Sequence, residues 1–320
     1  MIENALYEHL QSQKRLLSPY LAEYGGKMAI FNQEAPADTD PGWADPMEAP
    51  DEEEWEDEAD MQAGCNASAQ YGRIVFAVDL SDDAERKYSG TLAVDILCEK
   101  GIQLPEEIEP IVRLLIDGYF FSTKEITMYA QWNASNYFTE PTNKVIGVTL
   151  TFGLLAFPNQ TTIEPDPILL LNEWSCGALR AILGADIRVI GHDTLKPAWK
   201  PTNEVPAIYW RLVNIGPCGW IPDTYNCSWH TAVVSGHVLA PDTDVSASIA
   251  RTIDNVLTIK RRLIFDDMSP LMVDRNIRVN LASDPMRVGQ ITLDATYGIL
   301  NIPKPSNPLN HMNISGKEAT

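Results

Sequence analysis

The sequence lacks the features that mark membrane-spanning, secreted or disulfide-stabilised chains. No window approaches 18 uninterrupted apolar residues, and the opening stretch "MIENALYEHLQSQKRLL" has no basic-then-apolar signal pattern. The five cysteines are scattered and include no Cys-x-x-Cys pair, which fits a reducing compartment better than a disulfide framework. We therefore expect a chain that is intracellular when it is made and does not cross a membrane.

Positive charge is also scarce. The formal net charge is -20, from 24 basic and 44 acidic residues, and a surface of that sign repels phosphate backbones. Sequence-specific or general nucleic-acid binding is therefore not expected. Much of the acidic excess is local, because the range 34–60 holds thirteen carboxylates and no Lys or Arg falls between Met28 and Gly72.

Motifs for catalysis and cofactor binding are missing as well. The sequence contains no G-x-G-x-x-G, no G-x-x-x-x-G-K-[ST], no H-E-x-x-H and no G-x-S-x-G. A catalytic hypothesis needs a nucleophile, a base and an orienting group, or metal ligands at suitable spacing. We accordingly predict a protein without catalytic residues and without a cofactor.

Two clusters could in principle hold a metal ion. Cys218, Cys227, His230 and His237 offer zinc ligands, but their Cys-x8-Cys-x2-His spacing matches no tight structural site. The acidic run of residues 51–60 offers oxygen ligands for calcium, yet it lacks the turn glycine and spaced carboxylates of an EF-hand loop. We predict no bound metal at either place.

The acidic run is more typical of a solvated, extended segment, with contact to a basic partner surface as the alternative. Its tryptophans do not fit pure solvation, because an indole gains little from water, so they either anchor a partner or fold back on their own domain. Together with two tryptophans of the second half, this segment supplies the candidate partner-contact residues. They are Trp43, Asp51, Glu52, Glu53, Glu54, Trp55, Glu56, Asp57, Glu58, Trp199 and Trp220.

The sequence does contain a repeated order of segments. "TFGLLAFP" (151–158) and "TYGILNIP" (296–303) share four of eight residues, and each closes a series of matching landmarks, with Gly153 and Gly298 at corresponding positions. Each half opens with a helical leucine pattern, followed by a glycine-led short strand and a Pro-x-Trp segment. A strand pair, a second helix and a final strand pair complete each series.

The helices are expected to bury stripes of apolar residues at helical spacing. The first stripe holds Leu6, Leu10, Leu17 and Leu21, and the second half opens with Leu171, Ala178 and Ile182 after an Asp166-Pro167 start signal. The second helices begin near Pro105 and Asp244, and the closing strand pairs are 125–133 with 145–158 and 276–282 with 290–303.

These landmarks predict an α+β fold made of two similar domains, each ordered helix, strand, strand, helix, strand, strand, on a small mixed or antiparallel sheet. The first domain spans 1–158, with the acidic insertion at about 34–70, and the second spans 168–303. Residues 159–167 form a linker and 304–320 a flexible tail rich in Pro, Asn and Ser. The alternative is one large α+β domain.

This order of elements resembles the tail-terminator and tail-completion proteins of long-tailed bacteriophages, here in two copies. The resemblance rests on element order over nearly the whole chain and on no diagnostic motif. It implies a virion protein of the tail or neck, assembled in the host cytoplasm, that caps the tail tube and meets the head-side connector. Its partners would be copies of itself, the tail tube protein and the connector proteins.

Ring assembly is what the resemblance implies, because such domains form rings of six. Three chains with two copies each would make a pseudo-sixfold ring, and six chains with one copy in the ring is the alternative. Two further hypotheses stay open: another tail or baseplate component, and an enzyme or ligand-binding protein with a cleft between the copies to which His192, His230 or the acidic run contributes.

Overall fold

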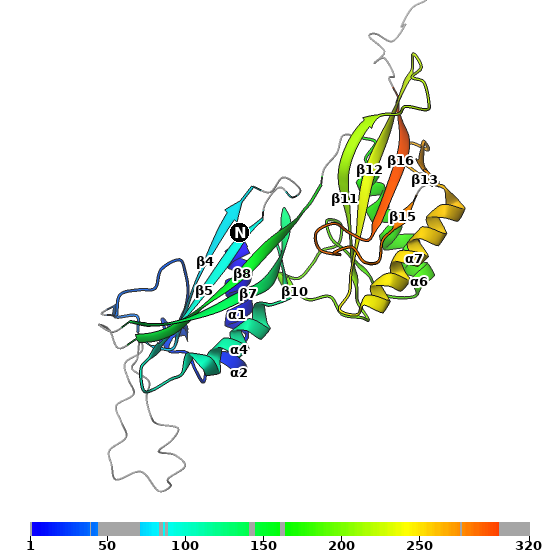
Figure 1. Ribbon diagram of the computed structural model, residues 1–320. Coiled ribbons are helices and arrows are strands. Elements are labelled where there is room, and N and C mark those ends of the chain that lie inside the picture. Colours follow the sequence, from blue (N-terminus) through cyan, green and yellow to red (C-terminus); the bar gives the residue numbers. More distant parts are fainter. Residues whose placement is uncertain are drawn as a thin grey trace, which may run out of the picture.

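The computed structural model describes residues 2–38, 40–43, 71–82, 86, 89–140, 145–160, 164–275 and 277–300. The chain has a mixed α+β fold with two curled sheets, and helices cover one face of each (Figure 1). Among the helices of these residues, none has the length and apolar character needed to cross a membrane.

The helical segments are α1 Ile2–Ser12, α2 Lys14–Leu17, α4 Pro105–Ile116, α5 Pro167–Trp174, the π-helical turn η2 Ser175–Leu179, α6 Arg180–Leu183 and α7 Thr243–Lys260. The strands up to residue 158 are β1 Glu23–Tyr24, β2 Lys27–Met28, β3 Ile30–Asn32, β4 Arg73–Ser81, β5 Ser89–Glu99, β6 Phe120–Ser122, β7 Ile126–Glu140 and β8 Val145–Pro158. The later strands are β9 Arg188–Val189, β10 Ala198–Trp199, β11 Ala207–Pro217, β12 Cys227–Leu239, β13 Arg262–Ile264, β14 Pro270–Val273, β15 Arg278–Val279 and β16 Ile291–Leu300.

The two large sheets have corresponding strand orders. The first runs β10-β6-β7-β8-β5-β4-β3, and the second runs β13-β14-β16-β12-β11-β9 with β15 beside β16. In each sheet a short edge strand is parallel to its neighbour, β3 to β4 and β9 to β11, and the other pairs are antiparallel. Apart from β10 and β15, the two orders agree strand by strand.

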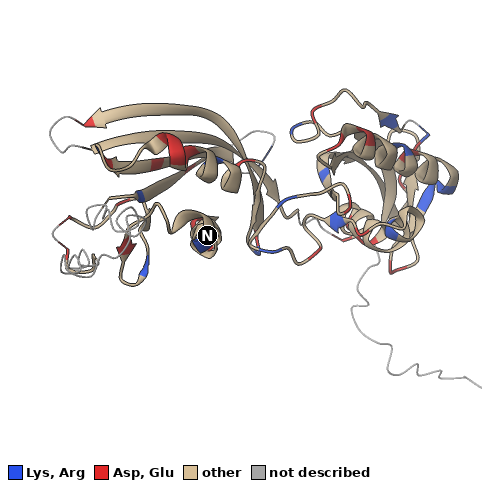
Figure 2. Ribbon diagram, turned by 90° about the horizontal axis from the view of Figure 1, so that it is seen from below, with Lys and Arg blue, Asp and Glu red and all other residues tan. Residues whose placement is uncertain are grey.

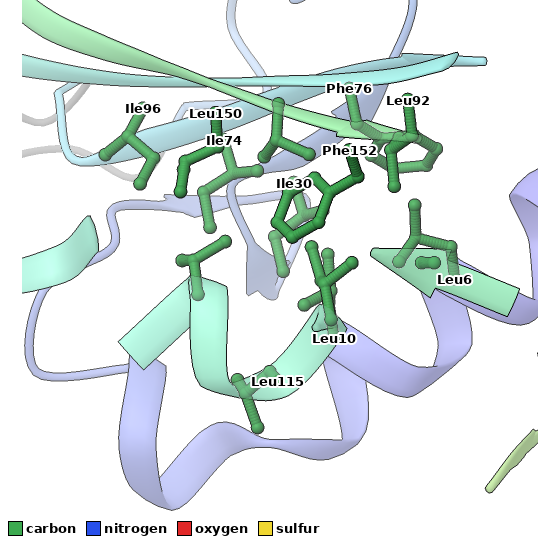
Figure 3. Packing of buried hydrophobic residues seen from close by; sticks show 14 of the residues in the cluster. Leu6, Leu10, Ile30, Ile74, Phe76, Leu92, Ile96, Leu115, Leu150 and Phe152 are labelled. Atoms are coloured by element: carbon green, nitrogen blue, oxygen red, sulfur yellow. The ribbon is translucent and has the colours of Figure 1, made fainter. Parts of the chain in front are cut away.

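The core under the first sheet follows the predicted helical stripe. Leu6, Leu10, Leu17 and Leu21 are all buried, which confirms that these positions face the core. The single helix that their spacing predicted is wrong, because the chain breaks the helix at Gln13 and α2 ends at Leu17, before Leu21. Figure 3 shows Leu6, Leu10 and Leu115 of the helices against the inward side chains of the sheet, among them Phe76 and Phe152. Alternate residues of each strand reach this layer because side chains of a strand alternate between its two faces.

The opening helix of the second half differs from its expected geometry. Its start signal is confirmed, since the carboxylate of Asp166 accepts hydrogen bonds from the amides of Ile168 (2.8 Å) and Leu169 (3.1 Å). The π-turn at 175–179 then adds a residue to one turn and rotates the rest of the helix by about 100°. The expectation that Ile182 faces the core is therefore wrong: it is 49 % exposed, and Leu179 is buried instead.

Two strand assignments of the second half also need correction. β16 pairs with β14 (Met272 opposite Thr296), whereas the segment 276–282 contributes only the two-residue β15, so it is not the main partner of the closing strand. β10, which contains the second Pro-x-Trp tryptophan, pairs with β6 in the first sheet. A segment beyond residue 167 thus belongs to the first sheet.

The two matching octets lie in the corresponding strands β8 and β16, but at different positions along those strands. In the first sheet, Phe152 stands four residues beyond Val148, which is level with the parallel edge pair. In the second, the β12–β16 register puts Gly289 level with that pair, and Tyr297 is eight residues further along. Gly153 and Gly298 are consequently not at corresponding positions, because sequence identity does not fix strand register.

One close approach in the second sheet generates a stability prediction. Gly236 lies opposite Trp210, and a Cβ at residue 236 would come within 2.5 Å of the buried indole. We expect Gly236→Ala to lower the free energy of unfolding by about 1–3 kcal/mol through overpacking, measured by urea denaturation. Gly216→Ala, in β11 with open space at its Cβ position, is the control; an equal effect of both substitutions would contradict the packing explanation.

Candidate functional site at the junction of the two sheets

Each sheet has two ends, which we name by the β4–β5 and β11–β12 hairpins. The tip end is where these hairpins turn, near Ser81 in the first sheet and Pro217 in the second. The base end is the opposite one, at Arg73 and Glu99 in the first sheet and at the Ala207–Leu239 pair in the second. The tip end of the first sheet meets the base end of the second.

An apolar cluster fills this junction. Phe120 and Phe157 come from the tip end of the first sheet. They pack with four buried residues of the second half, which are Ile190, Ala207, Tyr209 and Leu239. The ring centroids of Phe157 and Tyr209 are 5.1 Å apart in an edge-to-face arrangement, and the hydroxyl of Tyr209 donates to the carbonyl of Pro158 at 3.0 Å. Such aromatic pairs add to the free energy gained from area burial alone.

Arg86, in the β4–β5 connection, reaches across the junction. Its guanidinium donates to the carbonyl of Ala156 at 2.7 Å in its own half and to the carbonyls of Met286 and Arg287 in the other. The guanidinium carbon lies 4.6 Å from the ring centroid of Phe157, and only 2 % of the residue is exposed. One planar cation therefore links both halves through main-chain oxygens and an aromatic face.

His237 of β12 completes the polar part of the junction. Its Nδ1–H donates to the carbonyl of Pro285 at 2.8 Å, and its ring lies 5.6 Å from that of Tyr209. Burial, assisted by the positive charges of Arg86 and Arg211, lowers the pKa of His237 to about 3. The imidazole is thus neutral at neutral pH, and a proton on it would place a second cation in a buried, apolar setting.

A second connection runs through β10. Trp199 stacks on Phe120 with ring centroids 4.7 Å apart, and its indole N–H donates to the hydroxyl of Ser122 at 3.0 Å. Next to it, Lys200 donates to the carbonyl of Asp117 at 3.1 Å. The junction accordingly has two connecting arms. Arg86 reaches from the first half to the second, and β10 reaches from the second half to the first sheet.

The two ends outside the junction carry exposed apolar side chains. At the tip end of the second sheet, Trp220 is 61 % and Tyr225 91 % exposed. At the base end of the first sheet, the exposed apolar residues are Ile102, Leu104, Tyr137 and Phe138. Figure 2 shows that acidic and basic residues are spread along the ribbon of both halves of the described chain.

The predicted partner-contact tryptophans lie in three different settings. Trp43 is 7 % exposed, packs against Tyr24 and Phe31, and donates its indole N–H to Ala37, so it folds back on its own half. Trp199 is an internal contact of the junction, and Trp220 is at the surface. The other candidates lie outside the described residues: Asp51, Glu52, Glu53, Glu54, Trp55, Glu56, Asp57 and Glu58.

The four zinc-ligand candidates of the second half do not come together. Within the described ranges, the three ligand-bearing side chains that do lie close to one another are different ones, Cys176 with His192 and Asp193. His237 is committed to the junction, while Cys227 and His230 lie on β12 and Cys218 at the tip end.

Arg86 and Tyr209 were not among the sequence candidates, and His237 and Trp199 were considered only in other roles, as a zinc ligand and as a partner contact. Arg86 lies in "SDDAERKYSG", which looks like any polar hairpin connection, and Tyr209 and His237 look like strand residues. A buried strand histidine beside aromatic residues is a weak signal for such a contact. Nothing in the chain order indicates which carbonyl oxygens a hairpin arginine will meet.

Substitution of Arg86 tests the contact that this side chain makes across the junction. Arg86→Met keeps the apolar stem but leaves three carbonyl oxygens without their charged donor, so we expect a loss of about 2–4 kcal/mol in the free energy of unfolding, read from urea denaturation. Arg251→Met, on the exposed side of α7, is the matched control. An Arg86→Met protein as stable as the control would show that the arm does not hold the junction.

Acidification tests the contribution of the buried His237 imidazole. Between pH 6.5 and about 3, the unfolded chain binds a proton at His237 that the folded chain does not bind. The contribution of His237 to the free energy of unfolding is therefore fully present above pH 6.5 and is lost as the pH falls towards 3. We expect a contribution of up to about 1.4 kcal/mol per pH unit, seen in unfolding curves at pH 7, 5.5 and 4.5, and a weaker pH dependence in His237→Asn. His230→Asn serves as the control, and identical pH profiles of His237→Asn and the unmodified chain would refute this role.

Comparison with known proteins assigns no family to this chain. No protein-family model matches the sequence, and neither does any curated protein. The function therefore has to be inferred from the geometry of the junction and of the two exposed ends.

Proposed function

We propose that this chain is a structural assembly protein, a tandem duplication of a tail-terminator-like domain that forms a closed ring through repeated tip-to-base contacts. The observation that carries this proposal is the intrachain junction. Inside one chain, the tip end of the first sheet contacts the base end of the second. The base end of the first sheet and the tip end of the second sheet lie outside this junction.

The corresponding strand orders support a duplication. With corresponding sheets, a contact between the first and second sheet can be repeated between the second sheet of one chain and the first sheet of the next. Such a contact is heterologous, since it joins two different surfaces, and it makes a closed ring when the rotation per step divides a full turn. Three chains with two sheets each would give a ring of six sheets.

The character of the two free ends fits this scheme. The free tip end presents Trp220 and Tyr225, and the free base end presents Leu104 and Tyr137. Exposed aromatic and aliphatic side chains of this kind are enriched at the centres of protein interfaces. Their burial against each other would reproduce the aromatic packing that fills the intrachain junction.

The acidic insertion is attached at the same free base end. Trp43 precedes the run of residues 44–70 and Tyr71 follows it, and both rings lie within 6 Å of the guanidinium carbon of Arg73 at the start of β4. In the proposed ring, the acidic residues of this insertion would attract basic partner surfaces, such as those of a tube or connector protein.

The role in a phage tail rests on the resemblance in element order. A ring of small α+β domains would cap the tail tube, stop its growth and offer the opposite face to the head-side connector. The junction and the two exposed ends support ring assembly, and the resemblance supplies the identity of the partners. No chemistry is required of the chain in this role.

The mass of the assembly tests the proposal. We expect the purified chain to have the mass of a trimer in light scattering, with six-lobed rings in electron micrographs. Trp220→Ala combined with Tyr225→Ala removes the aromatic side chains of the free tip end and should shift the population to monomers by at least tenfold in dissociation constant, because interface aromatics dominate binding.

A matched control uses an exposed apolar residue away from both free ends. Leu114, on α4, is 68 % exposed, and Leu114→Ala should leave the trimer intact. A protein that stays monomeric at all concentrations, or a double aromatic variant with undiminished assembly, would contradict the proposed contact.

A further inference from the structure

We propose that Cys176, His192 and Asp193 form a zinc-binding site with three protein ligands. Cys176 lies in the π-turn η2, and the other two residues follow β9 in the connection to β10. The inference is independent of ring assembly, since it concerns side chains within one half. The spacing Cys-x15-His-Asp matches no known zinc motif, so only the tertiary structure brings the three side chains together.

The distances fit a tetrahedral metal ion. The Sγ of Cys176 lies 3.2 Å from Nδ1 of His192 and 3.5 Å from Oδ1 of Asp193, and these two atoms are 3.7 Å apart. Zinc bonds of about 2.0–2.3 Å at tetrahedral angles place ligand atoms about 3.4–3.6 Å from one another. Each observed separation agrees with this range within a few tenths of an ångström, so a small rotation of the side chains suffices.

Asp193 is already held in a ligating orientation. Its Oδ2 accepts hydrogen bonds from the guanidinium of Arg180 and from the amide of Val189 at 2.8 Å. Its Oδ1 is turned to Cys176 and His192. Carboxylates that bind metals typically have their second oxygen fixed by such outer hydrogen bonds, which reduces the cost of ordering the site.

Cys176 would bind zinc as the thiolate. A divalent cation between the three side chains would stabilise that thiolate by direct coordination, and the thiol proton would be released to solvent when the ion binds.

A pocket borders two of the three proposed ligands. His192 and Asp193 line a cavity of about 490 Å³ together with Ser122 and Thr127 of the first half and Asn159, the residue after β8. A tetrahedral ion with three protein ligands keeps its fourth position for water or a small ligand. The bound ion would also tie the segment that leads into β10 to the π-turn, and so stabilise one arm of the junction.

The π-turn itself fits a binding role. Ser175, one residue before the cysteine, accepts a hydrogen bond from the indole of Trp210 at 2.8 Å and donates to the carbonyl of Leu171 at 2.7 Å. These bonds fix the start of the wide turn against the core, and the turn carries Cys176 towards the β9–β10 connection. Single π-turns within helices occur frequently at functional sites.

Cobalt binding tests the proposal with a readout that does not depend on any activity. The full-length chain, reduced and freed of metal with a chelator, is titrated with Co²⁺; we expect one ion per chain and a thiolate-to-cobalt absorption band that zinc abolishes. Cys176→Ser should remove the band, and His192→Gln should weaken binding by more than about 100-fold, beyond the effect of losing an outer hydrogen bond. Arg180→Gln, which keeps all three ligands but removes the guanidinium that donates to Asp193 and to the carbonyl of Ile187, should weaken binding by about 10–100-fold and leave the band in place.

The chain offers its own control, because Cys218 and Cys227 could bind cobalt instead. The double variant Cys218→Ser/Cys227→Ser should keep the band and the stoichiometry of the unmodified chain. Thermal unfolding of every variant shows that it is folded, and zinc should raise the unfolding temperature of the unmodified chain but not that of Cys176→Ser. A band that survives in Cys176→Ser, a band lost in the double variant, or no cobalt binding by the unmodified chain would overturn the site.

Discussion

The burial of one guanidinium group between two sheets is the constraint on which the arrangement of this molecule depends. Arg86 donates to main-chain oxygens of both halves and lies on the face of Phe157, so the tip end of the first sheet can meet the base end of the second in one orientation. A buried cation tolerates little freedom, because each carbonyl left without its donor costs free energy. The aromatic packing around Arg86 buries apolar surface area, and the directional hydrogen bonds of the guanidinium set the orientation of the two sheets.

This directed contact gives the proposed assembly its logic. A chain whose two halves are joined tip to base has one unused surface of each type, and both carry exposed apolar side chains. The zinc site proposed beside the junction acts on the other connecting arm, since the segment after Asp193 leads into β10. Assembly and metal binding would therefore influence the same interface from two sides, through separate side chains.

Local patterns predicted most elements well, because helical spacing and strand alternation are written in neighbouring residues. The burial of the leucines from Leu6 to Leu21 and the start signal at Asp166 are confirmed, and the long strands lie where apolar alternation indicated them. Ile182 was assigned to the wrong face because an α-helical phase cannot reveal a π-turn. β10 was assigned to the wrong sheet because a two-residue strand has no periodicity of its own.

The sequence by itself determined the α+β class, the apolar face of the first helical segment and the concentration of carboxylates in one segment. Only the tertiary structure decided the strand register, the exchange of β10 into the first sheet, the burial of Arg86 and the meeting of Cys176 with His192 and Asp193. The physical reason is range. Secondary structure depends on contacts between residues a few positions apart, whereas a junction or a metal site depends on side chains that are distant in sequence and meet only after both cores have packed.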